Sequence, residues 1–211
     1  METEHRRDQE KQERYDGILD AAEQIFFSKG YERCSMDEIA RAARVSRALL
    51  YVYFTDKAAI MRGVALRAGT ELYSRFEEAV AQGQSGMKQI ENVGRSYYEF
   101  SRSQPDYFDV LTHIQGFIQD AETDTLTAAL LERSEQIMQL LAQAISRGIG
   151  DGTICRERAG HPLTTAYYLR GALHGVIMQC RQIEEPGLLG HPAPAALVDY
   201  TLSMLSCSLK P

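Results

Sequence analysis

A short segment of the sequence, from Ser35 to Lys57, carries an arginine and two tyrosines at spacings that leave all three outside the buried stripe of a helix. The guanidinium of Arg47 can donate two hydrogen bonds to the O6 and N7 atoms of guanine. The hydroxyl groups of Tyr51 and Tyr53 can contact phosphate oxygens or a base edge, and Lys57 can place a positive charge beside a phosphate. These residue types at these spacings predict contact with DNA.

Two short helices joined by a tight turn are predicted to position these side chains. Ser35 is followed three residues later by Glu38, an arrangement typical of a capping box, which opens a helix over residues 36–43. The free N–H groups at the start of that helix are expected to face a phosphate. Ser46 is placed to cap a second helix, residues 47–54, which would lie in the major groove. With a supporting helix before them, these elements form a helix-turn-helix.

The supporting helix is predicted over residues 14–29, because apolar residues recur there at steps of three and four and Gly30 can end the helix. Residues 1–13 form a charged extension without an apolar face, interpreted as a solvated tail in preference to an arm that tracks DNA. This extension either prolongs the helix or stays mobile. The DNA-binding domain is therefore placed at residues 14–58.

The distribution of charge favours a local contact with DNA. The chain has 23 Lys and Arg against 29 Asp and Glu, a net charge of −6, which argues against a protein that coats nucleic acid through bulk positive charge. Between residues 33 and 57, however, five basic side chains outnumber three acidic ones, a local charge of +2. Positive charge is thus concentrated at the predicted helix-turn-helix.

The segment resembles the DNA-binding segment of the TetR family of transcriptional regulators, which reads approximately T-x-x-x-I-A-x-x-A-G-V-S-x-G-x-L-Y-x-Y-F-x-x-K. From Ser35 to Lys57 this chain reads S-M-D-E-I-A-R-A-A-R-V-S-R-A-L-L-Y-V-Y-F-T-D-K, without a gap. The resemblance covers about residues 14 to 60, and the rest of the chain is similar to the family in helix order and length. The residues expected to contact DNA are Ser35, Met36, Arg44, Ser46, Arg47, Ala48, Leu49, Tyr51, Tyr53 and Lys57.

Three positions depart from the family pattern. Arg44 stands where the family usually has glycine, and a residue with a Cβ is strained there if φ is positive. Ala48 replaces a frequent glycine or proline. Leu49 replaces a small or hydroxyl residue and can offer only an apolar contact, for example to a thymine methyl group. The operator sequence is therefore not transferable from the family.

The rest of the chain, residues 59–211, is predicted to be a helical domain for ligand binding and dimerisation, so that the whole chain is all-α. Helical periodicity runs through nearly every segment, and β-branched runs bounded by turn residues are missing. About nine helices result, and those not given above are expected over residues 55–82, 87–102, 106–118, 123–147, 163–183 and 194–209. The resemblance implies that the first of these carries ligand-induced motion to the reading helices.

Aromatic residues gather in the middle of this second domain, where they could line a cavity for a small-molecule effector. A packed aromatic core without a cavity is the alternative, and the resemblance favours the pocket. No cluster of charges defines the charge of the effector. The residues expected to contact it are Tyr97, Phe100, Tyr107, Phe108, His113, Phe117, Met138 and Tyr167.

The last two helices are predicted to form a dimer interface, because two glycines allow close approach and the apolar surface exceeds what one helix pair can hide. The resemblance implies a four-helix bundle with a second copy, whose two-fold axis suits a palindromic operator. The loop from Pro186 to Pro194 is an ordered crossing or a mobile strap. The predicted interface residues are Leu169, Gly171, Leu173, Gly175, Val176, Leu197, Tyr200 and Met204.

Several other classes of protein are disfavoured. No apolar run approaches the roughly 18 residues of a membrane helix and the first residues are too polar for a secretory signal, so a cytoplasmic protein without a membrane partner is expected. Free thiols are expected because the cysteines lack the spacing of a disulfide framework, and neither a metal nor a cofactor is predicted. The histidines His113, His161 and His174 are isolated by spacing, which disfavours an enzyme.

The function expected from these observations and the resemblance is a homodimeric, DNA-binding transcriptional regulator. It would be a repressor that binds a palindromic operator in double-stranded DNA and is released by a small lipophilic effector. An activator is one alternative. The other is an all-α small-molecule-binding dimer with weak or altered DNA recognition, because Arg44 and Leu49 lie where the DNA face should be.

Overall fold

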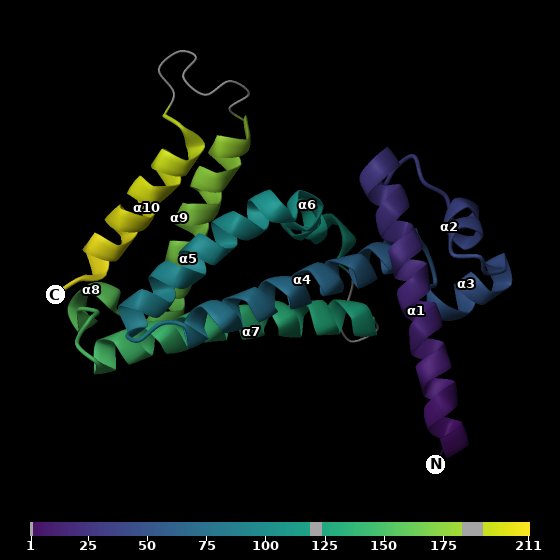
Figure 1. The fold of residues 1–211 in the computed structure, drawn as a ribbon, viewed down its shortest axis with the longest axis horizontal. Coiled ribbons are helices and arrows are strands. Elements are labelled where there is room, and N and C mark those ends of the chain that lie inside the picture. The colour runs from purple at the N-terminus through teal and green to yellow at the C-terminus, as the bar shows by residue number, and fades with distance from the viewer. Residues whose placement is uncertain (1, 119–123, 183–191) are drawn as a thin grey trace. The chain divides into compact units, whose positions relative to one another are not determined.

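The computed structural model describes residues 2–118, 124–182 and 192–211, which are helical apart from turns and short connections (Figure 1). No strand occurs among these residues, so the all-α prediction is confirmed. The elements are α1 (Glu2–Lys29), α2 (Met36–Ala42), α3 (Arg47–Tyr53), α4 (Lys57–Ala81), α5 (Gly86–Ser103), α6 (Pro105–His113), the 3-10 helix η1 (Ile114–Phe117), α7 (Thr125–Gly150), α8 (Arg156–Ala159), α9 (Pro162–Gln182) and α10 (Pro194–Leu209).

Helix α1 begins at Glu2, so the charged extension prolongs the helix. Its exposed polar side chains pair along the helix: Gln9 Nε2 donates to Glu13 Oε1 at 3.1 Å, and Gln12 Nε2 donates to Asp16 Oδ2 at 3.0 Å. Such i,i+4 pairs stabilise the N-terminal part of the helix, which has no apolar face to bury. The short helix α8 was not predicted, since a segment of four residues is too short to show helical periodicity.

The chain divides into two compact units, each with its own core. The first unit comprises residues 1–68 and 109–130, and the second comprises residues 69–108 and 131–211. Helices α4, α6 and α7 each contribute residues to both units. The predicted functional boundary at residue 58 stays a prediction.

In the first unit, α1, α2, α3 and the start of α4 enclose an apolar core. The rings of Tyr15 and Phe54 stack at a centroid distance of 5.0 Å, which joins α1 to the end of α3. Gly63 permits α4 to approach α1 closely, because a Cβ atom at this position would lie 2.9 Å from Leu19 Cδ2. The core residues include Ile18, Leu19, Phe26, Ile39, Leu50, Phe54, Ile60 and Val64.

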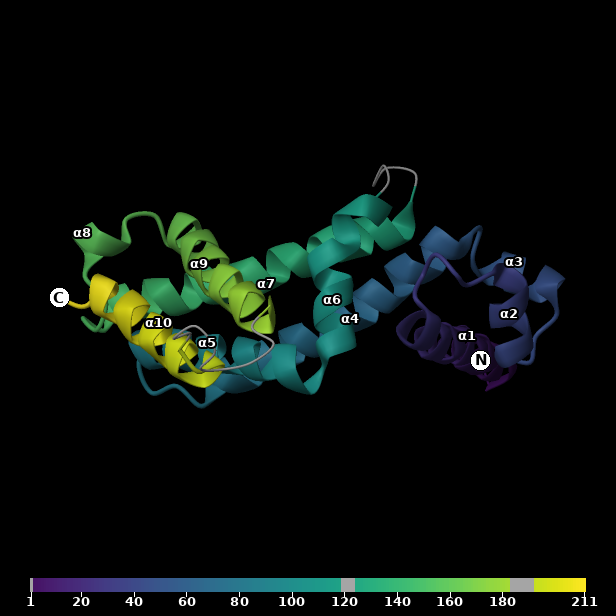
Figure 2. The ribbon, with the colours of Figure 1, turned by 90° about the horizontal axis from the view of Figure 1, so that it is seen from above.

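In the second unit, α9 and α10 run side by side and α5 packs against both (Figures 1 and 2). Gly94 lets Leu202 of α10 pack onto α5, because a Cβ at Gly94 would come within 2.5 Å of Leu202 Cδ2. Gly86 makes an even closer approach to the backbone of Gly148 at the end of α7. In the described part of the chain, no helix combines the length and the apolar character needed to cross a membrane.

Candidate nucleic-acid interface and ligand site

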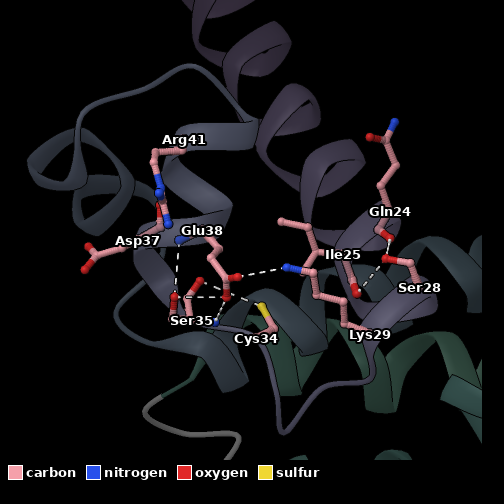
Figure 3. A network of polar contacts seen from close by, with 9 residues as sticks. All are labelled: Gln24, Ile25, Ser28, Lys29, Cys34, Ser35, Asp37, Glu38 and Arg41. Atoms are coloured by element: carbon pink, nitrogen blue, oxygen red, sulfur yellow. Dashed lines mark hydrogen bonds and ion pairs between the residues drawn. The ribbon is translucent and has the colours of Figure 1, made fainter.

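The capping box predicted at the start of α2 is confirmed (Figure 3). Ser35 Oγ accepts a hydrogen bond from Glu38 N at 3.3 Å, and Glu38 Oε2 accepts one from Ser35 N at 3.0 Å. Lys29 Nζ, at the end of α1, donates to Glu38 Oε1 at 2.9 Å. The hydrogen bond from Lys29 and those from Ser35 lower the pKa of Glu38 to about 2. Glu38 thus caps α2 through Ser35 and joins it to α1 through Lys29.

The turn between α2 and α3 contains the strain that the sequence predicts. Arg44 has a φ of 55°, the left-handed conformation that favours glycine, and it is the single non-glycine residue with positive φ in the described residues. The backbone closes around it, because Val45 N donates to Ala40 O at 3.0 Å. Since the Arg44 side chain is exposed, its guanidinium is available to a phosphate.

Helix α3 presents a face to solvent opposite its buried residue Leu50. Ser46 caps the helix as predicted, with its Oγ accepting from Leu49 N at 3.1 Å. Tyr51 is 43% exposed and Val52 is 76% exposed. Val52 was not predicted to belong to this face, although its position four residues after Ala48 could have indicated it. Of the other predicted contacts, Ser35, Ser46, Arg47 and Ala48 are exposed, whereas Met36, Leu49 and Tyr53 are half-buried.

Arg47, the first residue of α3, is held from two sides. Its Nη1 lies 3.1 Å from each carboxylate oxygen of Asp37 in α2. Its guanidinium also lies over the ring of Tyr51, 5.6 Å from the ring centroid. All these groups are at the surface, so the arginine is oriented and accessible at the same time.

Lys57 was predicted to contact a phosphate, but its ammonium group turns toward the protein. Nζ donates to the backbone carbonyls of Tyr31 at 2.7 Å and Cys34 at 3.0 Å, and it lies 4.1 Å from the centroid of the Tyr31 ring. Lys57 therefore holds the loop that precedes α2. A contact with phosphate, which stays a prediction, would use the third N–H of the ammonium group.

The second unit brings two of the predicted ligand residues together around a histidine. Tyr97 Oη and His174 Nδ1 share a hydrogen bond of 2.8 Å, and the ring of Phe108 lies 5.6 Å from Tyr97 and 5.4 Å from His174. Phe76 contacts Tyr97 edge-on at 6.0 Å. Burial raises the pKa of Tyr97 to about 12 and, together with nearby Arg170, lowers the pKa of His174.

His174 was missed as a member of this group, which we call the Tyr97 cluster (Tyr97, Phe108, His174 and Phe76). Its partner lies 77 residues away in the sequence, so no local spacing could indicate the pair. Among the other predicted ligand residues, Met138 is buried, and its sulfur lies 3.7 Å from Arg170 Nη1.

Other predicted ligand residues lie elsewhere. Phe117 belongs to the first unit, where its ring meets Tyr31 edge-on at 4.7 Å, and exposed His113 hydrogen-bonds the carbonyl of Asp109. Tyr167 is 55% exposed, which corrects its assignment to an interior site. Phe100 is buried with Arg75 over its ring, and Tyr107 is half-buried.

Helices α9 and α10 expose part of the predicted dimer interface. Tyr200 is 62% exposed and Met204 is 52% exposed, and Cβ atoms built on Gly171 and Gly175 would meet open space. Tyr168, also exposed, was missed. Leu169 and Leu173, also predicted at the interface, are buried within the single chain.

Val176 and Leu197 are half-buried. Residues 186–191 of the predicted loop lie outside the described residues. Among the described residues, no group of three or more His, Cys, Asp or Glu side chains could hold a metal ion.

Comparison with known proteins shows that the helix-turn-helix matches a family of bacterial regulators. Residues 18–70 match the model of a family described as bacterial regulatory proteins, tetR family. Over 90 residues the chain is 29% identical to the HTH-type transcriptional activator FasR of Mycolicibacterium smegmatis, which covers 43% of this chain and 41% of that protein. The chain therefore spans less than half the length of this relative.

Two solved structures share the fold over almost the whole chain. A structure of the transcriptional regulator FadR from Bacillus subtilis in complex with stearoyl-CoA has a TM-score of 0.71 at 17% identity, covering 92% of this chain and 99% of that one. A structure of AibR in complex with isovaleryl coenzyme A and operator DNA has a TM-score of 0.65 at 20% identity, covering 90% and 97%. At these identities the similarity establishes the fold.

Proposed function

We propose that this chain, whose residues 18–70 match the tetR family of bacterial regulatory proteins, is a dimeric repressor that binds a palindromic operator and is released by a small lipophilic effector. The observation that carries the proposal is the exposed face of α3. There an oriented arginine, Arg47, heads a short helix whose outer surface also holds Tyr51. An arginine at this place in a recognition helix can read guanine in the major groove.

The proposed homodimer is supported by the exposed apolar side chains of α9 and α10. Tyr200 and Met204 expose surface that a second copy would bury, and Gly171 and Gly175 allow a facing helix to come close. Two copies related by a two-fold axis would present two α3 helices to successive major grooves, about 34–36 Å apart on B-DNA. The operator would then be palindromic, with one half-site for each copy.

The Tyr97 cluster is the proposed effector site. Its rings offer apolar contact, and the Tyr97–His174 hydrogen bond provides a polar group that can orient a ligand. The lipophilic class is supported by the two similar structures, which are complexes with stearoyl-CoA and isovaleryl coenzyme A. Activation of transcription is a second candidate, supported by the name of the relative FasR.

Selection of binding sites from random duplex DNA tests the proposal. We expect the enriched sequences to be palindromes whose half-site centres lie about 10 base pairs apart or a multiple of that distance. Repeating the selection with stearoyl-CoA as the first probe should reduce recovery of these sites. Failure to enrich any sequence would contradict DNA recognition. Enrichment that the probe leaves unchanged would argue against this effector class and leave DNA binding standing.

A further inference from the structure

Asp37 is an acidic residue at the predicted DNA face, where a negative charge opposes binding to a polyanion. Its two carboxylate oxygens each lie 3.1 Å from Arg47 Nη1. Figure 3 shows its side chain pointing away from the capping box, in which the neighbouring Glu38 serves as the capping carboxylate. Asp37 is therefore not required to cap α2, and its carboxylate instead pairs with the arginine that heads α3.

The contact leaves part of the Arg47 guanidinium free. Arginine carries five N–H donors, and the Asp37 carboxylate contacts the Nη1 group. The Nη2 and Nε groups lie outside this ion pair, and an edge of two such donors pairs with the O6 and N7 atoms of guanine. Tyr51 further restricts the orientation of the guanidinium, through a side-chain hydrogen bond and through its ring, whose centroid lies 5.6 Å away.

The same contact makes a phosphate a poor partner for Arg47. If the guanidinium left Asp37 to bind a phosphate, the carboxylate would lose its cation beside a polyanion. If it stayed, the phosphate would lie close to a negative charge. A guanine edge is uncharged, so it can accept hydrogen bonds from Arg47 while Asp37 keeps its place.

We propose that Asp37 is a specificity-determining residue of the DNA interface, which positions Arg47 for guanine and opposes its pairing with phosphate. This inference rests on the proposed function, because it requires that α3 reads DNA. Asp37 is a positioning residue, acting on DNA through Arg47. Removal of the Asp37 charge should therefore weaken discrimination between DNA sequences more than it weakens overall DNA binding.

The test compares the full-length protein with Asp37→Asn, which keeps the shape of the side chain and removes its charge. Fluorescence anisotropy would measure binding to a selected operator and to a random duplex of equal length at several salt concentrations. The ratio of the two affinities should fall about five- to tenfold, within the discrimination that one bidentate arginine–guanine pair supplies. For random DNA, the slope of log K against log salt should steepen by about 0.9, as one phosphate contact is gained.

Three further variants separate this role from a general effect of charge. Glu32→Gln removes one negative charge from an exposed residue of the loop before α2 and should leave the affinity ratio unchanged. Asp37→Glu should restore part of the ratio. In an Arg47→Ala background, Asp37→Asn should cause no further loss, because Asp37 acts through Arg47. Thermal melts would verify that each variant folds, as expected for an exposed ion pair.

Three results would overturn the inference while the wild-type protein still selects its operator. One is an unchanged affinity ratio in Asp37→Asn. Another is an equal fall in the ratio for Glu32→Gln, which would assign the effect to net charge. The third is a full effect of Asp37→Asn without Arg47. If the wild-type protein does not discriminate between operator and random DNA, the proposed function fails together with the inference.

Discussion

Arg44 is the residue at which this chain departs most clearly from the glycine of the family pattern. Its φ of 55° places an arginine in the left-handed region, which costs an L-residue with a Cβ roughly 1–2 kcal/mol. The turn itself is closed by backbone hydrogen bonds, so the conformation does not depend on the side chain. We infer that the arginine is kept at this position for a contact made by its guanidinium.

Replacing Arg44 by glycine separates backbone strain from side-chain function. Arg44→Gly should raise stability by about 0.5–1 kcal/mol, because relief of strain exceeds the added entropy of the unfolded chain. Arg44→Ala keeps the Cβ and should bring no such gain. Both variants should weaken operator binding equally if the guanidinium contacts a phosphate. Thermal unfolding and anisotropy titrations measure these effects, and an equal gain in stability for both variants would refute the strain argument.

His174 gives the second unit a dependence on pH. Burial lowers the pKa of His174 in the folded protein, so the unfolded state binds a proton more readily. Stability contributed by the neutral form is therefore present above the unfolded pKa of about 6.5 and is lost as the pH falls below it. The melting temperature of the wild type should fall more than that of His174→Gln between about pH 7.5 and 5.5. Parallel curves for the two proteins would exclude this role.

At the scale of elements, two arginines of α4 hold the first unit together. Arg67 reaches three carboxylates of α1, with Nη2 2.7 Å from Asp16 Oδ1. Arg62 is only 2% exposed; its Nη1 donates to Phe117 O at 3.1 Å, and its Nε lies 2.5 Å from Asp124 Oδ2. The latter contact is an ion pair without the angle of a hydrogen bond. Asp124 in turn accepts from Leu126 N at the start of α7.

Arg62 should therefore matter more for stability than Arg67. Arg62→Ala leaves the carboxylate of Asp124 without its cation in a largely buried site, which should cost about 3–5 kcal/mol. Arg67→Ala should cost about 1 kcal/mol, because Arg67 and two of its partners, Asp16 and Asp20, are more exposed. Urea unfolding followed by circular dichroism provides the comparison. Adding Asp124→Asn to Arg62→Ala should recover part of the loss, and equal losses for the two single variants would contradict the argument.

Features that lie within one element or turn could be predicted from the sequence, whereas contacts between distant elements could not. Both caps and the strained turn are local, because Ser35, Ser46 and Arg44 act on residues within four positions of themselves, and the sequence was sufficient for these. The Tyr97–His174 pair joins α5 to α9 and could not be predicted from spacing. Likewise, periodicity marks the apolar residues of a helix without distinguishing a side chain that faces the core from one such as Tyr200 that faces outward.

The proposed function requires that two copies of the protein form a dimer. The protein should sediment at about twice its mass of 23.7 kDa. The double variant Tyr200→Asp/Met204→Asp places two charges on the exposed surface of α10 and should shift the protein toward monomer. Leu131→Asp, a change at an exposed leucine of α7, is the matched control and should remain dimeric. A monomeric wild type at micromolar concentration would contradict the dimer.

One titration tests whether α3 reads DNA through Arg47. Binding of the wild type, Arg47→Ala and the control Arg156→Ala to a selected operator would be measured by anisotropy at one salt concentration. Arg156 is an exposed arginine of the second unit, so its removal should have no effect. The account predicts that Arg47→Ala weakens operator binding by about 1–3 kcal/mol and leaves the thermal melt unchanged. Operator binding that is equally tight in all three proteins would contradict it.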